Sequence, residues 1–595
     1  MGSQCHKALD YAGLLKEGSR RLIDRAYRLA EERDGEAKDF SLAFAIGLEG
    51  MIAHAMNYSR EAFNLSGRCQ DPQRKEELIE IARICARVPA EAPNTFHEAL
   101  QALWFYYMVA GDSPGRVDQF LLSFYERDLE KGILSKAKAL ELLECLLIKM
   151  HDDYMGPDCN VSSVHTLTVG GLSSEGEDAT NELTYLFLEA ARNVRLLRPS
   201  LYIRCHAHSP DRLIRLGVDM LAEGLSEPSF YGDEPIIAGL ERVGVSTCEA
   251  RDYVLGGCTE VVSPGRGNWG APTGWINLGL LCDEVIRDAA DRDIRNATGL
   301  WEVFSEHLGQ VAEACRDITA RFDEQALPDL ENSLLMPCCL KNGAAMSRGG
   351  AESYYGQWAG VGLPNAADMF FAAQNLCFEK GQSLRALLAL VDSGDRQTMA
   401  MIRNLPKFGN GMREVDEWAS VLLEKVSGEL EKRSTPLRKA IFFGHLSGGQ
   451  SINIDYGLHM GATLDGRRAG QPLADSLAGS HGNSRKGPTA LIQSITSLDH
   501  SRLQAGNVST LMLHQEDVRT SEARGQCAAL VKCFFAQGGS QLQLNFVDAQ
   551  TLRLAQQDPE GHRGLTIRIA GYSADFTGVA RNIQDEVIAR TEGME

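Results

Sequence analysis

The stretch Arg568–Phe576 reads Arg-Ile-Ala-Gly-Tyr-Ser-Ala-Asp-Phe and lies near the C-terminal end of the 595-residue sequence. The residues before it, from Gly564 to Ala570, alternate β-branched and polar side chains in a way that predicts a buried strand. That strand stops at Gly571, where a glycine permits a positive φ angle and a close approach of another backbone. For an isolated glycine, a simple turn is the ordinary interpretation.

The surrounding string is more specific, because it closely resembles the signature of the glycyl radical enzymes, Arg-Val-(Ala/Ser)-Gly-Tyr-Ser-Ala near the C-terminus. Asn582–Thr591 also resembles the terminal helix of that family. The resemblance implies that Gly571 loses a Cα hydrogen and stores an unpaired electron. Glycine suits this task because the flanking amide nitrogen and carbonyl delocalise the spin, and no Cβ obstructs planarity. A buried loop must then keep oxygen and water away.

A second motif, Gly-Gly-Cys-Thr-Glu, lies in the stretch Tyr253–Gly265. Cys258 follows two glycines, so the backbone can turn sharply and present the sulfur at a loop tip. Glu260 lies two residues further, and in an extended segment such positions point the same way, so thiol and carboxylate are expected to face one cavity. Taken alone, Cys-x-Glu also suits an inert buried cysteine beside a solvated glutamate.

Gly-Cys-x-Glu resembles the active-site loop of the eliminating and decarboxylating branches of the glycyl radical family. The resemblance implies that Cys258 gives its hydrogen atom to the Gly571 radical, and that the thiyl then abstracts hydrogen from a substrate carbon. Glu260 would act as general base or acid, and a dry cavity is expected to raise its proton affinity. The expected reaction is a dehydratase-like elimination of water, an amine or a sulfonate from a small polar molecule. Decarboxylation of an arylacetate-type acid is the alternative.

Three other residues are candidates for contact with substrate, although packing is the more common role of each type: His165, Tyr231 and Trp275. In diol-type dehydratases an acidic residue follows the Cys-x-Glu loop, whereas Asn268–Trp275 contains no carboxylate. Glycerol or propanediol is therefore not the expected substrate.

Two further alternatives concern the class of protein. Cys338-Cys339 resembles the thiol pair of pyruvate formate-lyase, but that pair belongs on the active-site loop, where this chain offers Cys258 alone. Formate acetyltransferase activity is therefore disfavoured. A non-catalytic radical-bearing protein on the same fold is also disfavoured, because such a module needs neither Cys258 nor Glu260.

The hydrophobic periodicity predicts an α/β fold. Residues 1–155 are mostly helical by period, and from Val161 strands alternate with a helix at Glu182–Val194, which implies a parallel sheet. Pro199–His206 is the second of these strands. The resemblance implies a ten-stranded barrel of two five-stranded parallel half-barrels inside a helical shell, with the cysteine and glycine loops meeting at its centre.

The polar stretch Gly479–Gly487 is the predicted internal boundary. It separates a pyruvate formate-lyase-like catalytic domain, residues 1–478, from a C-terminal glycine radical domain, residues 488–595. Movement at this stretch would allow an activating enzyme to reach Gly571. The resemblance also indicates that the usual N-terminal region of the family is shortened here.

Composition restricts the partners. A formal charge of −20 argues against nucleic acid and anionic membrane surfaces, and no apolar run approaches the roughly 18–20 residues of a membrane span. The absence of an apolar signal region and the scattered cysteines predict a cytoplasmic protein with reduced thiols, and the lack of Cys-x-x-Cys predicts no metal site. The resemblance implies a homodimer with no dissociable cofactor, activated by a separate radical S-adenosylmethionine enzyme that carries an iron–sulfur cluster.

Overall fold

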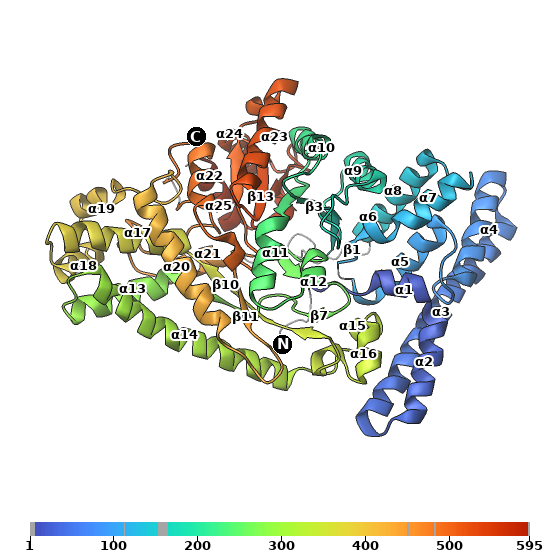
Figure 1. Cartoon of the computed structure of the whole chain (residues 1–595). Coiled ribbons are helices and arrows are strands. Elements are labelled where there is room, and N and C mark those ends of the chain that lie inside the picture. The colour runs from blue at the N-terminus through green and yellow to red at the C-terminus, as the bar shows by residue number, and fades with distance from the viewer. Residues whose placement is uncertain (1–5, 112, 153–164, 449–450, 481–482, 593–595) are drawn as a thin grey trace.

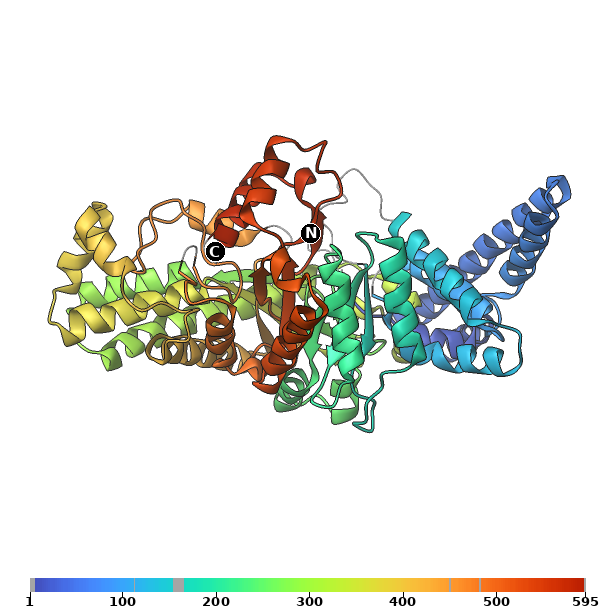
Figure 2. The same cartoon turned by 90° about the horizontal axis from the view of Figure 1, so that it is seen from above.

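The structure, a computed structural model, describes residues 6–111, 113–152, 165–448, 451–480 and 483–592 (Figure 1). Its N-terminal part is helical, as the periodicity predicted. The helices are α1 (Tyr11–Glu17), α2 (Ser19–Glu32), α3 (Gly35–Arg68), α4 (Pro72–Arg87), α5 (Phe96–Ala110), α6 (Val117–Phe120), α7 (Leu122–Glu130) and α8 (Lys136–Asp152). Both views place these blue helices at one end of an elongated molecule whose strands lie in the middle (Figures 1 and 2).

A six-stranded sheet follows in the order β1-β2-β3-β4-β13-β12. Its strands are β1 (Gly115–Arg116), β2 (Thr166–Gly170), β3 (Ser200–Cys205), β4 (Ser229–Gly232), β12 (Thr510–Leu513) and β13 (Gln541–Phe546). The pairs are parallel except for β4 with β13, which is antiparallel. Helices α9 (Glu182–Val194) and α10 (Asp211–Ala222) provide the crossovers that parallel neighbours require. The observed α9 has the bounds that the periodicity predicted.

A three-stranded parallel sheet continues this arrangement, with β8 (Gly274–Asn277), β10 (Gly356–Val361) and β11 (Ile441–His445). The two sheets are connected through the segment just before β12. There the His445 N–H donates to Gly506 O over 3.0 Å, and the Val508 N–H donates to His445 O over 3.2 Å. The chain therefore forms a run of parallel strands on each side of the antiparallel β4–β13 junction.

Helices cover the strands from outside. They are α11 (Asp233–Arg242), α12 (Thr247–Arg251), α13 (Leu278–Asp291), α14 (Ala297–Gln325), α15 (Leu330–Leu334), α16 (Pro337–Asn342), α17 (Leu363–Ala372), α18 (Leu384–Asp392), α19 (Arg396–Arg403), α20 (Arg413–Glu431), α21 (Ile452–Leu458), α22 (Pro488–Thr496), α23 (Ser521–Ala536), α24 (Ala549–Gln557) and α25 (Arg581–Glu592). Short 3₁₀ turns occur at Met346–Arg348, His500–Arg502, Gln515–Val518 and Phe576–Gly578, and a π-helical stretch at Ala373–Glu379. None of the described helices combines the length and the apolar content that a bilayer span requires.

Three small strand pairs complete the fold. They are β5 (Val254–Gly256) with β6 (Glu260–Val262), β7 (Gly267–Asn268) with β9 (Ser353–Tyr354), and β14 (Thr566–Arg568) with β15 (Ser573–Asp575). The C-terminal hairpin packs with α24 and α25 into an apolar cluster of its own, and Cys258 is a member of that cluster. The β5–β6 hairpin is thus positioned against the C-terminal segment.

The α/β class and the parallel strands that the sequence predicted are confirmed. The ten-stranded barrel of two equal halves stays a prediction, because the described pairings give a six-stranded and a three-stranded sheet. The antiparallel β4–β13 pair could not be foreseen, since periodicity does not encode which distant strands become neighbours. The start of the predicted strand, at residues 161–164, lies outside the described residues.

Candidate active site

Gly571 forms the tip of the β14–β15 hairpin. A hydrogen bond closes this tip, in which the Ile569 N–H donates to Tyr572 O over 2.9 Å. The glycine is buried and has a φ of +90°, a region that disfavours side chains. Space imposes a second requirement. A Cβ on Gly571 would lie 2.8 Å from Cys258 Cβ and 3.1 Å from Thr259 Cγ2. The radical-motif glycine therefore touches the cysteine loop directly.

Cys258 forms the opposing tip, in the loop between β5 and β6. Gly257, just before it, has a φ of +54°, so the sharp turn expected from the paired glycines is present. The Cys258 side chain is 3% exposed and packs in an apolar cluster with Ala570 and Tyr572. The two predicted loops thus meet in a buried, apolar contact.

The backbone of the cysteine loop is held by two tyrosines on neighbouring strands. The Tyr202 hydroxyl lies 2.7 Å from Gly257 O and 2.9 Å from Cys258 O, and the Tyr231 hydroxyl lies 3.3 Å from Cys258 O. Their rings pack edge to face, with centroids 5.1 Å apart. Sequence reasoning proposed Tyr231 for substrate contact, and the structure places its hydroxyl on the loop backbone. Tyr202 was not foreseen, because nothing in its strand marks it.

Arg568 ties the glycine loop to the body of the protein. This fully buried side chain forms an ion pair with Glu227, whose Oε1 also accepts a 2.9 Å hydrogen bond from Ser573 Oγ. The guanidinium lies over the Tyr202 ring, 5.4 Å from its centroid. Burial alone would lower the pKa of Arg568, but the charge of Glu227 reverses this and raises it, so the arginine stays cationic.

Glu260 corrects one sequence expectation. Its carboxylate is buried and accepts hydrogen bonds of 2.9 Å from His6 Nδ1 and from the Thr259 N–H. Burial is the largest influence and raises the pKa of Glu260, as expected from a dry cavity. The His6 charge and both hydrogen bonds outweigh it, so the net pKa lies below the ordinary value. The prediction of raised proton affinity was wrong because it omitted His6.

His6 reaches Glu260 because the segment that carries it is fixed at several points. Ala8 O accepts a 2.9 Å hydrogen bond from Gly265 N–H, and Asp10 N–H donates to Leu335 O over 3.0 Å. The His6 ring also lies directly against Gly257, where a Cβ would collide with it. No motif surrounds this histidine, so only the folded chain reveals its place in the site.

The other two sequence candidates lie in different surroundings. His165 is buried at the start of β2, where its ring contacts Tyr107 with centroids 5.5 Å apart. Burial, followed by the charge of Arg198, lowers the pKa of His165 to about 4, so the ring is neutral at pH 7. Trp275 is half-buried on β8, and its indole N–H has no partner among the described residues.

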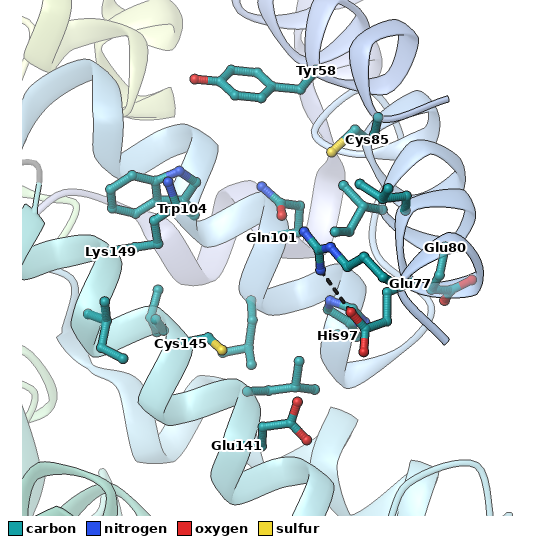
Figure 3. A pocket seen from close by; sticks show the side chains of 18 of the residues that line it. Tyr58, Glu77, Glu80, Cys85, His97, Gln101, Trp104, Glu141, Cys145 and Lys149 are labelled. Atoms are coloured by element: carbon teal, nitrogen blue, oxygen red, sulfur yellow. Dashed lines mark hydrogen bonds and ion pairs between the residues drawn. The ribbon is translucent and has the colours of Figure 1, made fainter. Parts of the chain in front are cut away.

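A cavity of about 940 Å³ lies elsewhere, between α3, α4, α5 and α8 (Figure 3). Its labelled lining includes Cys85, His97, Trp104 and Cys145, and an ion pair of Arg74 with Glu77 spans 2.8 Å at its rim. It contains neither of the two hairpin tips. This cavity is therefore separate from the contact between the two loops.

Comparison with known proteins gives matches over most of the chain. A family model described as "Pyruvate formate lyase-like" matches residues 2–452, and one described as "Glycine radical" matches residues 473–577. The chain is 27% identical to trans-4-hydroxy-L-proline dehydratase of Clostridioides difficile, over 92% of this chain and 74% of that protein. It is 30% identical to isethionate sulfite-lyase of Nitratidesulfovibrio vulgaris, over 98% of this chain and 76% of that protein.

Among solved structures, the fold is similar to that of the glycerol-bound B12-independent glycerol dehydratase from Clostridium butyricum. The TM-score is 0.91 at 29% sequence identity, covering 98% of this chain and 79% of that chain. The likeness therefore extends over nearly the whole chain.

Proposed function

The chain belongs to the pyruvate formate lyase-like family and carries a glycine radical domain, so it is a glycyl radical enzyme, and from that premise we propose that it is a lyase. The proposed reaction is a dehydratase-like elimination that cleaves a carbon–oxygen or carbon–sulfur bond of a small polar molecule. The dehydratase and sulfite-lyase relatives support this reaction class. The substrate itself is left to experiment.

One observation carries the proposal, the contact between the two hairpin tips. A Cβ at Gly571 would lie 2.8 Å from Cys258 Cβ, so the glycine Cα and the cysteine side chain are neighbours with no residue between them. A hydrogen atom can therefore pass directly from one of these residues to the other. The contact is buried, and Cys258 packs among the side chains of Ala570 and Tyr572, which limits the access of water.

We assign radical storage to Gly571 and radical transfer to Cys258. In the first step the Cys258 S–H bond breaks homolytically, its hydrogen atom forms a C–H bond at the Gly571 radical, and a thiyl radical remains. The two bonds are similar in strength, so the step is reversible. The thiyl then takes a hydrogen atom from the substrate carbon that bears a hydroxyl group, and Cys258 recovers its S–H bond.

Glu260 is assigned the proton transfers. Because its pKa is lowered, the carboxylate is the resting form and can accept the proton of the substrate hydroxyl. The resulting ketyl-type radical expels the β substituent with its electron pair, and a leaving hydroxide becomes water by taking the proton that Glu260 accepted. The product radical then takes a hydrogen atom from Cys258, and the Cys258 thiyl regains one from Gly571, which restores the stored radical. His6, 2.9 Å from Glu260, is placed to stabilise the carboxylate.

Trp275 is the residue that we assign to substrate binding. Its indole N–H lacks a partner among the described residues and its side chain is half-buried, which suits a donor to a polar substrate group. For His165 and Tyr231 we propose supporting roles, because their described contacts are with other protein groups.

We propose that a separate activating enzyme generates the radical, and because Gly571 and its neighbours are buried, that enzyme must gain access to them. We propose a radical S-adenosylmethionine enzyme with an iron–sulfur cluster as that partner. For it to reach the glycine, the glycine radical domain, proposed as residues 488–595, must move away from the β5–β6 hairpin.

The decisive test is anaerobic activation followed by electron paramagnetic resonance of the wild type and Gly571→Ala. A doublet signal that is present in the wild type and lost in the variant is expected. Turnover is then measured with hydroxylated, aminated and sulfonated substrates, with Cys258→Ser expected to abolish it and Glu260→Gln to reduce it severely. Release of CO2 from an arylacetate would instead support the decarboxylase alternative. Absence of a signal after co-expression with a competent activase would refute the proposal.

A further inference from the structure

Tyr202 occupies a special position, because it contacts both loops that must meet for radical transfer. We propose that Tyr202 is a positioning residue that holds the Cys258 loop in register with Gly571 and thereby sets the rate of hydrogen-atom exchange between them. The inference rests on the proposed function, since it concerns the transfer between the same two residues.

On the cysteine side, the single hydroxyl proton of Tyr202 is shared between two consecutive backbone carbonyls. Its hydroxyl lies 2.7 Å from Gly257 O and 2.9 Å from Cys258 O, both inside the protein. These carbonyls belong to the turn between β5 and β6, and the paired strands of that hairpin begin again at Glu260. A buried carbonyl without a partner is costly, so the hydroxyl fixes the turn in the conformation that presents the thiol.

On the glycine side, the Tyr202 ring supports Arg568, which stands three residues before Gly571. The guanidinium lies 5.4 Å from the ring centroid and is paired with Glu227. Asn545 clamps the same residue at the backbone, accepting from Arg568 N–H over 2.9 Å and donating to Arg568 O over 2.7 Å. The glycine hairpin is therefore anchored to the same sheet as the cysteine loop. We call Tyr202 and Asn545, the two residues of this sheet that hold the loops, the platform.

The platform is rigid because Tyr202 and Asn545 both stand on strands of one sheet. Tyr202 lies on β3 and pairs in register with Ser229 of β4, and β4 pairs with β13, which carries Asn545. Sites built on strands hold their geometry more precisely than sites built on loops. Tyr202 thus connects two flexible tips through a stiff element.

A direct catalytic role for Tyr202 is disfavoured by its contacts. Its side chain is 0% exposed and its hydroxyl is engaged by backbone carbonyls, so it does not face a substrate. Misplacement of reacting atoms by about 1 Å can cost on the order of 100-fold in rate, so a small shift of the cysteine loop has a large effect.

The test measures the exchange itself. When the activated enzyme is placed in D2O, the Cys258 thiol becomes S–D, gives its deuterium atom to the Gly571 radical, and regains either a hydrogen or a deuterium atom from the same carbon. Each return of hydrogen to sulfur leaves deuterium on the glycine radical, which collapses the doublet of the electron paramagnetic resonance signal. The rate of this collapse reports the register of the two residues without any substrate.

Tyr202→Phe, which keeps the ring beneath Arg568 and removes the hydroxyl, is expected to slow the collapse by at least about tenfold. Its radical yield is expected to stay close to that of the wild type, because Gly571 is unchanged and Arg568 keeps its ion pair with Glu227. Tyr231→Phe is expected to have a smaller effect, since its hydroxyl lies 3.3 Å from Cys258 O. Tyr106→Phe is the matched control. Tyr106 is a buried tyrosine whose hydroxyl donates over 3.3 Å to Pro89 O, which belongs to neither of the two loops.

The outcomes separate this inference from the proposed function. No radical in the wild type, or collapse that persists in Cys258→Ser, contradicts the proposed function. Collapse in the wild type that is equally fast in Tyr202→Phe overturns the positioning role alone. Amide hydrogen exchange of the peptide containing Gly257 and Cys258 provides a second measurement that needs no radical. It is expected to increase in Tyr202→Phe and stay unchanged in Tyr106→Phe, and equal exchange in both variants would also overturn the inference.

Discussion

At the level of single residues, the site depends on one position that tolerates no side chain. Gly571 combines a φ of +90° with a neighbour, Cys258, whose Cβ would lie only 2.8 Å from an added Cβ, closer than van der Waals contact. The positive φ angle and the lack of space for a Cβ are two separate reasons for a glycine at this position. Many glycines in turns have only the positive φ angle. Gly564, in the same hairpin, has a φ of +84° but nothing within 4 Å of an added Cβ. A comparison of Gly571 with Gly564 therefore separates the cost of backbone strain from the cost of a collision between an added Cβ and Cys258.

Gly571→Ala is expected to destabilise the protein more than Gly564→Ala. The positive φ angle alone costs about 1–2 kcal/mol at either position, and contact with Cys258 adds to it only at Gly571. Urea unfolding of both variants measures the difference. Equal losses of unfolding free energy would show that the Gly571 hairpin can move away from Cys258 without cost.

His6→Ala is expected to move the acidic limb of the kcat/KM profile to higher pH. His6 lowers the pKa of Glu260, and without it the burial of the carboxylate raises that pKa. Glu260 then becomes protonated, and inactive as a base, at a higher pH than in the wild type.

His6→Gln is the matched variant, because it keeps a hydrogen-bond donor and removes the charge. An intermediate shift of the acidic limb is expected from it. Identical profiles for the wild type and His6→Ala would show that a group other than Glu260 controls the acidic limb.

At the level of elements, α25 is attached to the body of the protein by a buried charge. Arg590 is 5% exposed and forms an ion pair with Asp475, which lies in the segment before the predicted domain boundary. Glu586, one turn earlier, approaches the same guanidinium at 3.8 Å. Removal of Asp475 would leave the buried Arg590 charge compensated only by the more distant Glu586, whereas an exposed pair contributes little. The Arg590–Asp475 pair therefore contributes to the docking of the helix.

Asp475→Asn is expected to increase amide hydrogen exchange in α25 by on the order of 100-fold, which corresponds to about 3 kcal/mol of lost protection. Arg581→Ala, which breaks an exposed pair with Asp585 at the start of the same helix, is expected to change exchange little. Hydrogen–deuterium exchange with mass spectrometry resolves the two. Unchanged protection of α25 in Asp475→Asn would mean that apolar contacts alone hold the helix.

At the scale of the whole molecule, the N-terminal segment, the β5–β6 hairpin and the C-terminal hairpin come from distant parts of the chain and meet at one point. Cys258 is consequently covered by the C-terminal segment, being packed against Ala570 and Tyr572. Access to this thiol is a measure of the movement that an activating enzyme requires.

Alkylation of the native protein is expected to label Cys248 and Cys533, which are exposed, well before Cys258. Asp475→Asn is expected to accelerate labelling of Cys258 selectively, because the C-terminal segment is less firmly docked. Cys282, buried in the body, is the control site and is expected to stay protected in both proteins. Mass spectrometry of the alkylated peptides gives all these rates. Equal acceleration at Cys282 would indicate global unfolding and contradict a selective movement.

The sequence alone identified the family, because the motifs that mark it are local patterns. The radical-motif glycine, the Cys-x-Glu pair and the helix Glu182–Val194 are encoded by neighbouring residues, and the family follows from the order of the two motifs. Residue type and spacing were sufficient to predict these features, because turn conformation, strand alternation and helix period act over a few positions.

Only the tertiary structure decided what surrounds these residues. It placed His6 beside Glu260 and so lowered a pKa that burial alone would raise. It also placed Tyr202 and Arg568 between the loops, and it made β4 and β13 antiparallel neighbours. The physical reason is that electrostatic and packing interactions depend on distance in space, and contacts between remote segments leave no period or spacing in the sequence.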